Sequence, residues 1–183
     1  MNKKIILIFS LTVLAIVMSG CVDPNNPPEA TTGNEELTAA DLIVVRNIPS
    51  GFEYLGAPPT SVDDIKSEYV DVAGIVNAAE GIYQDADSVD LRITVVECED
   101  NTAADEFVNQ YKLSLPPLAR GTQFAEESFN GHFATRIMDY TTVGGEQVAR
   151  YSYLWSNDNF VFIVNGNTED FTQTRALAEA TGQ

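Results

Sequence analysis

Three turn signals in the last third of the chain constrain its fold more than any other feature. They are Asn130-Gly131, Gly144-Gly145 and Asn157-Asp158. Asn-Gly is the dipeptide most typical of a two-residue β-hairpin turn, because both residues tolerate the positive φ that this turn requires. Consecutive strands joined by such turns pair antiparallel. The pattern therefore predicts a meander of four strands, over residues 124–129, 132–140, 147–155 and 160–165.

Two main helices accompany this meander. Thr102 is the expected N-cap of the first, which ends before Pro116-Pro117. Its inward apolar stripe comprises Ala104, Phe107, Val108 and Tyr111. Thr168 is the expected N-cap of the second helix, over residues 169–180. The apolar contacts of that helix are Phe171, Leu177 and Ala178.

The N-terminal half adds further strand signals. Ser61 and Asp64 have the spacing of a capping box and predict a short helix over residues 62–69. Strands are expected over residues 42–45, 51–55, 80–83 and 91–96. The fold class is therefore α+β, with one antiparallel sheet of about five to seven strands and the two main helices packed on one face.

The most aromatic strand is the best candidate for a binding surface. Side chains alternate across a strand, so Tyr151, Tyr153 and Trp155 share one face. A turn centred on Asn157-Asp158 pairs Trp155 with Phe160, Tyr153 with Phe162, and Tyr151 with Val164. We favour a core role under the final helix, because cross-strand aromatic pairs are ordinary sheet stabilisers. The alternative is a platform on which sugar rings stack, exposed at least at Trp155.

The charge of the chain argues against polyanionic partners. The chain carries 27 acidic and 10 basic side chains, a net charge of −17. The acids are spread along the sequence, which indicates a solvated acidic surface. Such a surface repels nucleic acid and suits a protein that works outside the cell in raised salt. A cation-collecting surface is the alternative.

Residues with catalytic or metal-binding chemistry are few. His132 is the only histidine and cannot form a His-based metal site alone. Cys98 is expected to be a buried small hydrophobe, with acidic neighbours that raise the pKa of its thiol. The acidic segment 85–90 lacks the glycine of a calcium loop and is interpreted as a turn. We therefore expect no metal, no cofactor and no catalytic site.

The N-terminal segment indicates where the protein resides. Lys3 and Lys4 precede an apolar run over residues 5–18, which is short for a membrane span. The following Met18-Ser19-Gly20-Cys21 resembles the lipobox of a prokaryotic lipoprotein signal peptide. The resemblance implies cleavage between Gly20 and Cys21 and lipid on the Cys21 sulfur. An ordinary cleaved signal or a short uncleaved anchor is the alternative.

This interpretation divides the chain into three parts. Residues 1–20 are the signal peptide, and residues 21–37 are the lipidated cysteine with a tether rich in Pro, Asn and Thr. Residues 38–183 form a single globular domain. After cleavage, eight basic and 27 acidic side chains remain, a net charge of −19.

The strands of the C-terminal third carry a second resemblance. Residues 129–136, 150–155 and 160–166 are similar to the C-terminal part of small surface lipoproteins of prokaryotes, archaeal ones especially, that have no assigned activity. The resemblance covers roughly a third of the chain. It implies an anchored extracytoplasmic domain and carries over no site residues.

The expected function is non-catalytic binding. We expect a membrane-anchored extracytoplasmic lipoprotein whose domain binds a protein or a small ligand. One alternative is an envelope structural component or an accessory subunit for transport. Another is a hydrolase of surface polymers that uses two carboxylates. Its candidate residues are Glu97, Glu126, Glu127 and Asp139.

Replacing the predicted lipid attachment residue tests the anchor. Cys21→Ser should move the protein from the membrane fraction to the soluble fraction, because the acyl chains that supply membrane affinity have no attachment atom. Immunoblotting of the two fractions measures this. A variant that stays as tightly bound as the parent contradicts lipidation at Cys21.

Overall fold

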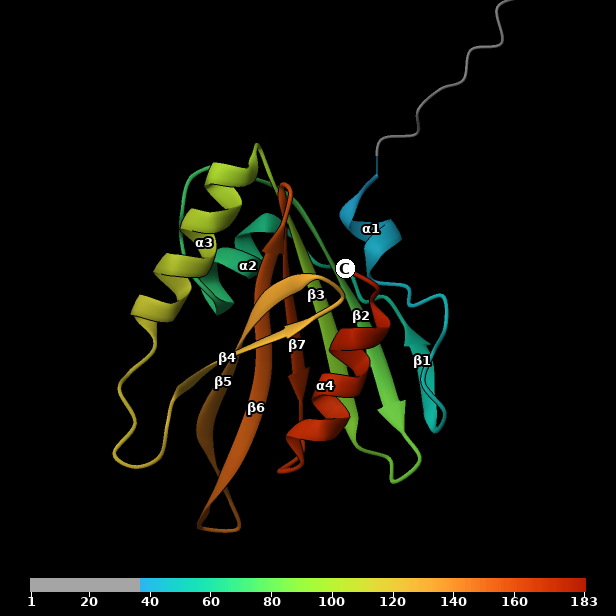
Figure 1. The fold of residues 1–183 in the computed structure, drawn as a ribbon, viewed down its shortest axis with the longest axis vertical. Coiled ribbons are helices and arrows are strands. Elements are labelled where there is room, and N and C mark those ends of the chain that lie inside the picture. The colour runs from blue at the N-terminus through green and yellow to red at the C-terminus, as the bar shows by residue number, and fades with distance from the viewer. Residues whose placement is uncertain (1–36) are drawn as a thin grey trace, which may run out of the picture. The chain divides into compact units, whose positions relative to one another are not determined.

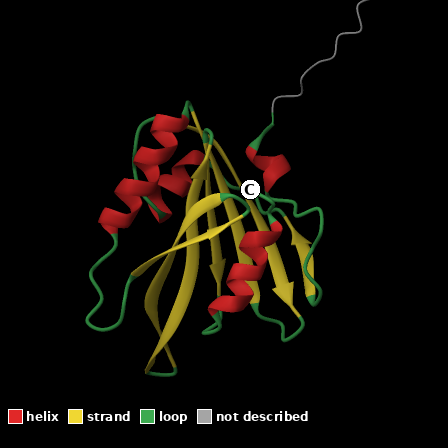
Figure 2. Cartoon of the chain, viewed as in Figure 1, coloured by secondary structure: helices red, strands yellow, loops and turns green. Residues whose placement is uncertain are grey.

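The computed structural model describes residues 37–183, which hold one antiparallel sheet of seven strands in the order β1-β2-β3-β7-β6-β5-β4 (Figures 1 and 2). The predicted signal peptide, Cys21 and nearly all of the tether lie outside these residues. The strands are β1 (Phe52–Gly56), β2 (Ile75–Asp85), β3 (Asp90–Cys98), β4 (Phe124–Phe129), β5 (His132–Val143), β6 (Glu146–Asn157) and β7 (Phe160–Gly166). The helices are α1 (Ala39–Leu42), α2 (Val62–Glu68), α3 (Asn101–Ser114) and α4 (Phe171–Ala180). The α+β class and the antiparallel sheet are therefore confirmed. Within residues 37–183, none of the helices has the length and apolar character needed to cross a bilayer.

The predicted meander forms at the three predicted turns. Asn130 and Gly131 have φ values of 53° and 88°, and Phe129 pairs directly with His132. Gly144-Gly145 joins β5 to β6. The third turn lies one residue later than predicted, because Asp158 takes the positive φ of 52° and Asn157 pairs with Phe160.

This later turn corrects the cross-strand pairs but preserves the faces. Trp155 lies opposite Phe162, Tyr153 opposite Val164, and Tyr151 opposite Gly166. Each pair is shifted by two residues from the prediction. Because side chains alternate with a period of two, a two-residue shift leaves every side chain on the predicted side of the sheet.

Both faces of the central strands are buried. Along β7, Phe162 and Val164 enter one apolar cluster, while Val161 and Ile163 enter a second cluster on the other face. Strand β3 divides in the same way, with Leu91, Ile93 and Val95 on the first face and Val96 and Cys98 on the second. A strand that is apolar on both sides needs cover on both sides.

The helices supply one layer on each face. Leu42 of α1 and Leu177 of α4 belong to the first cluster, and Ile65 of α2 and Phe107 of α3 belong to the second. Figure 1 shows α4 in front of the sheet, with α2 and α3 beside each other at its other side. The expectation that the two main helices pack on one face is therefore not confirmed. Covering only one face would leave Val161 and its neighbours in water.

Residues 42–45 do not form the predicted strand. Thr38 and Asp41 form a capping box that begins α1, and the chain then continues as a loop. Ile43 and Val45 are nevertheless buried in the first cluster. The Tyr83 hydroxyl replaces a ladder partner: it donates to the Ile43 carbonyl (2.7 Å) and accepts from the Val45 N–H (2.9 Å). A buried backbone polar group needs a partner, and a side chain from β2 provides it.

The helix starts are partly as predicted. Ser61 and Asp64 form the predicted capping box of α2. In α3 the N-cap is Asp100 instead of Thr102, and in α4 it is Asp170 instead of Thr168. Both differences favour the stronger cap, since an aspartate carboxylate accepts from the first-turn N–H groups better than a threonine hydroxyl. The predicted stripe of α3 does face the sheet through Ala104 and Phe107.

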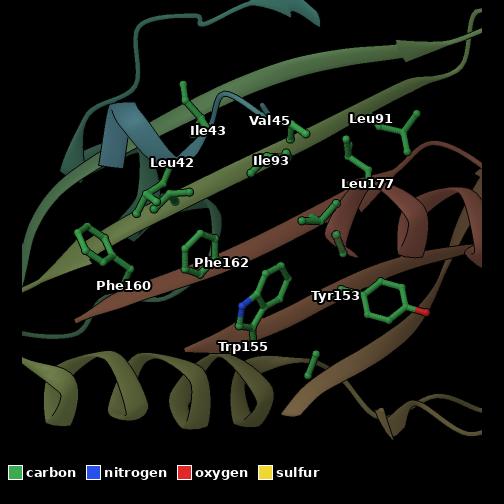
Figure 3. Close-up of a cluster of buried hydrophobic side chains, with 14 of the residues drawn as sticks. Leu42, Ile43, Val45, Leu91, Ile93, Tyr153, Trp155, Phe160, Phe162 and Leu177 are labelled. Carbon is green, nitrogen blue, oxygen red and sulfur yellow. The ribbon is translucent and has the colours of Figure 1, made fainter. Parts of the chain in front are cut away.

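The aromatic face of β6 is core. Tyr153 and Trp155 have exposed fractions of 0% and 1%. The Trp155 ring stacks on Phe162 with centroids 5.0 Å apart and lies edge-on to Phe129 at 5.3 Å (Figure 3). Offset stacks and edge-on contacts are the favoured aromatic geometries. Figure 3 also shows Leu177 of α4 among these side chains.

The emission of Trp155 tests this burial. Because Trp155 is the only tryptophan, its fluorescence should be blue-shifted and protected from acrylamide in the folded protein. A Trp155→Phe variant supplies the background signal. Red-shifted emission that acrylamide quenches as efficiently as free tryptophan would contradict the packing in Figure 3.

Candidate ligand groove

A groove of about 590 Å³ opens on the sheet face that α2 and α3 cover only in part. Its floor crosses five strands, from β2 to β5. The floor includes the side chains of Arg92, Asn165, Ser152, Ile137, Arg150 and Asp139. Tyr111 and Leu115, at the end of α3, form one wall, and Ile82 lies at the other side.

Strand register builds this floor from residues far apart in the sequence. Arg92 pairs with Asn165, Asn165 with Ser152, and Ser152 with Ile137. These four side chains therefore form one row across the sheet, on the face opposite to Trp155. Nearer the strand ends, Arg150 pairs with Asp139 in a second row.

The back of the groove is a polar network that holds α2 on the sheet. Arg92 contacts two carboxylates, Glu68 of α2 at 3.1 Å and Glu80 of β2 at 3.2 Å. The Tyr69 hydroxyl lies 3.2 Å from the Thr94 hydroxyl and accepts from the Asn165 side-chain amide at 3.3 Å. The charge of Arg92 is thus compensated within the domain. Arg92 serves mainly to position the floor.

Arg150 differs from Arg92 because it has no carboxylate partner within residues 37–183. Its Nε donates to the Asn167 side-chain oxygen (3.0 Å), and one Nη donates to the Ala149 carbonyl (2.9 Å). Asp139 lies opposite in the ladder, but one of its carboxylate oxygens accepts from the Tyr140 N–H at 2.7 Å. Two neutral partners therefore fix the guanidinium of Arg150, which makes no ion pair within the described residues but lies across the ladder from the carboxylate of Asp139.

Of the predicted aromatic platform, Tyr151 alone is among the residues that line the groove. Tyr153 and Trp155 are buried on the opposite face, where they form part of the core. Tyr151 is half-buried on that same face, edge-on to Phe171 at 5.7 Å. The core interpretation therefore holds for Tyr153 and Trp155, and the platform interpretation is wrong for them.

The carboxylates considered for hydrolysis are dispersed. Glu127 is 16% exposed and accepts from Arg136 of β5 (2.7 Å) and Arg175 of α4 (2.8 Å). The Tyr153 hydroxyl also donates to Glu127 at 3.1 Å, so this carboxylate ties α4 to the β4–β5 hairpin. Glu126 pairs with Lys112 at 3.1 Å. Glu97 pairs across the ladder with Phe160, and among the four only Asp139 lines the groove.

The other residues that the sequence analysis considered have structural roles. Cys98 is buried, and burial together with Asp100 and Glu97 raises the pKa of its thiol to about 11. The acidic segment forms the β2–β3 turn, in which Asp85 accepts from two backbone N–H groups. His132 follows the Asn130-Gly131 turn. In the part of the chain that the structure describes, no three His, Cys, Asp or Glu side chains are grouped to hold a metal ion.

Sequence reasoning did not identify Arg92, Arg150 and Asn165 as neighbours. A signal was present, because polar residues at alternate positions of apolar strands indicate a face that is only partly covered. Assembling them required the strand order, which places β7 between β3 and β6.

Comparison with known proteins adds no relative. No family model matches the chain, and neither a curated protein nor a solved structure matches it.

Buried tyrosines should make stability fall at high pH. Burial raises the pKa of Tyr111 to about 12 and raises the pKa of Tyr69 further above its ordinary value of 10.0. The pKa values of Tyr83 and Tyr153 are also raised, mainly by burial. Because the folded-state pKa exceeds the unfolded one, the neutral form is stabilised below pH 10 and this contribution declines as pH rises through 10 towards 12.

Urea unfolding measured at pH 8, 10 and 11 tests this dependence. The free energy of unfolding should decline between pH 10 and 11, and Tyr111→Phe should reduce the slope because one titrating group is removed. The same experiment between pH 7 and 8 is the control, since tyrosines do not titrate there. An unfolding free energy that stays constant up to pH 11 would contradict the burial of these phenols.

Proposed function

We propose that this protein is a lipid-anchored, extracytoplasmic binding protein that holds a ligand in the groove of the α2/α3 face without converting it. The observation that carries the proposal is the groove floor, where neutral partners hold the Arg150 guanidinium in place and it makes no ion pair with the described residues. A polar side chain that hydrogen bonds hold in place at the floor of a groove suits recognition of a ligand group.

The anchor rests on the sequence of residues 1–21. The lipobox resemblance at Met18-Ser19-Gly20-Cys21 supports membrane lipid as a partner through Cys21. A single acyl chain binds membranes only marginally, so a diacylated cysteine would hold the protein stably. The net charge of −17 supports a place outside the cell and argues against nucleic acid as a partner.

The distribution of carboxylates favours binding over hydrolysis. Two acids, Asp90 and Asp139, line the groove. They belong to β3 and β5, with β7 and β6 between them. Three strand spacings of about 4.8 Å separate these strands by roughly 14 Å. Glycosidases place their two carboxylates about 5 to 9.5 Å apart, which is less than the backbone spacing of this pair.

Filling the groove tests the proposal. Ser152→Trp places a large ring on the groove floor and should abolish binding of the full-length protein, in detergent, to an array of surface glycans and extended peptides. Thr142→Trp is the matched control, because Thr142 is exposed on the neighbouring strand and does not line the groove.

The two variants separate the outcomes. Loss of array signals with Ser152→Trp and their retention with Thr142→Trp supports a binding groove. If both variants retain the array signals, the ligand is recognised elsewhere on the protein, and the proposal is overturned. Circular dichroism and thermal unfolding of both variants check that the fold is kept.

A further inference from the structure

We infer that the groove binds an uncharged saccharide, whose hydroxyl groups are recognised by a row of fixed polar side chains. This inference rests on the proposed binding function and adds the class of ligand. Its support is the charge balance of the lining, the way the polar side chains are held, and the hydrogen-bonding atoms that they leave free.

The charges in the lining disfavour a charged ligand. Arg92 is neutralised by two carboxylates of α2 and β2. Arg150 lies across the ladder from Asp139, and Asp90 is the other carboxylate of the lining. A carboxylate ligand would meet these two aspartates, a cationic ligand would meet the guanidinium of Arg150, and like charges placed together cost free energy. The lining therefore favours a ligand without net charge.

The second row of the groove floor extends beyond Arg150 and Asp139. On the side of Arg150 away from Asp139, its Nε donates to the Asn167 side-chain oxygen at 3.0 Å. The Asn167 N–H in turn donates to the Asp90 carbonyl at 3.0 Å, which places Asp90 next in the row. The second row therefore runs from β3 to β5, over roughly 14 Å, in the order Asp90, Asn167, Arg150, Asp139.

The domain holds each member of the second row through one part of its polar group. Asn167 uses its side-chain oxygen for Arg150, and one Nη of Arg150 donates to a backbone carbonyl at 2.9 Å. One carboxylate oxygen of Asp90 accepts from the Gln84 side-chain amide at 2.9 Å. One carboxylate oxygen of Asp139 accepts from the backbone N–H of the next residue at 2.7 Å. These bonds fix the side chains before a ligand arrives, which lowers the entropy lost on binding.

The same four side chains leave other hydrogen-bonding atoms free. The second Nη of Arg150 and the side-chain amide nitrogen of Asn167 make no hydrogen bond to the described residues, and both are donors. The second carboxylate oxygens of Asp90 and Asp139 are likewise unpaired within residues 37–183, and both are acceptors. The second row therefore offers an acceptor, two donors and an acceptor, in that order. Ser152, in the neighbouring row, adds a hydroxyl.

Donors and acceptors placed side by side suit hydroxyl groups. A hydroxyl both donates and accepts, so the hydroxyls of a sugar donate to the aspartates while they accept from the arginine and the amide. A neutral saccharide carries such groups around each ring. An apolar ligand would instead bury these polar atoms without partners, which costs free energy. This recognition uses hydrogen bonds and does not involve the rings of Tyr153 and Trp155, which are buried on the opposite face.

Two other classes of ligand fit the groove less well. Nucleic acid is disfavoured, because its phosphates are repelled by the aspartates of the lining and by the net charge of −17. That charge does not act against an uncharged saccharide. An extended peptide is also disfavoured, because peptides that bind sheets pair with an edge strand, whereas this groove crosses strands that are already paired.

The first test compares neutral and charged oligosaccharides by calorimetry. The neutral probes are tetrasaccharides of glucose, mannose, galactose and N-acetylglucosamine, while tetragalacturonate is the anionic probe and tetraglucosamine is the cationic one. The full-length protein is kept in a detergent without a sugar headgroup. At least one neutral probe should bind, and both charged probes should bind about tenfold more weakly or worse. The affinity of the neutral probe should be the same at low and at high salt, because no ion pair is screened.

Matched arginine variants test the second row. Arg150→Lys keeps the charge but loses the planar group that Asn167 holds, so it should weaken binding of the neutral saccharide by about tenfold. Arg46→Lys is the control, because Arg46 is exposed and does not line the groove, and it should bind like the parent. If Arg150→Lys binds like the parent, or if Arg46→Lys weakens binding equally, recognition by the fixed guanidinium is overturned.

The remaining outcomes separate this inference from the proposed function. If the array signals that depend on Ser152 come from peptides or charged glycans, the class of uncharged saccharide is overturned and the binding function stands. A charged probe that binds as tightly as the best neutral one, or an affinity that falls with salt, overturns that class as well. Saccharide binding that Ser152→Trp leaves intact lies outside the groove and also overturns the inference. If no probe binds and no array signal depends on Ser152, the proposed function fails too.

Discussion

Burial of both faces of β3 and β7 is the constraint on which the rest of the structure depends. Val95 and Phe162 point to one side of the sheet, and Val96 and Ile163 point to the other. Neither set tolerates water, so the chain places α4 on one face and α3 on the other. The Glu127 ion pairs with Arg136 and Arg175 then connect α4 to the β4–β5 hairpin.

The groove forms because the strands of the sheet are longer than the helix that covers them. Strands β5 and β6 have 12 residues each and extend roughly 40 Å, whereas α3 has 14 residues and extends about 21 Å. The α2/α3 layer therefore covers only part of the sheet, and the strand ends beyond it carry polar side chains. Arg92, Asn165 and Ser152 are suited to that place, because they sit where apolar cover ends and water begins.

Local signals predicted elements well where one interaction dominates. The Asn130-Gly131 turn and the Ser61–Asp64 capping box formed at the predicted residues, since a positive φ or a side-chain cap depends on neighbours in the sequence. Predictions failed where two neighbouring residues could each cap a helix or form a turn. Asp100 and Asp170 cap helices in place of nearby threonines, and the β6–β7 turn moved by one residue. The predicted strand over residues 42–45 did not form: Leu42 ends α1, and the Tyr83 hydroxyl satisfies the backbone of the loop that follows.

The sequence by itself determined the α+β class, the C-terminal meander and the face on which each residue of β6 lies. Those properties follow from turn chemistry and from the two-residue period of a strand. Only the tertiary structure decided which helix covers which face and which polar residues meet in the groove. The order β3-β7-β6 brings Arg92, Asn165 and Ser152 into one row, although they lie up to 73 positions apart in the chain. Pairing between such distant strands depends on how the whole core packs, and no local pattern encodes it.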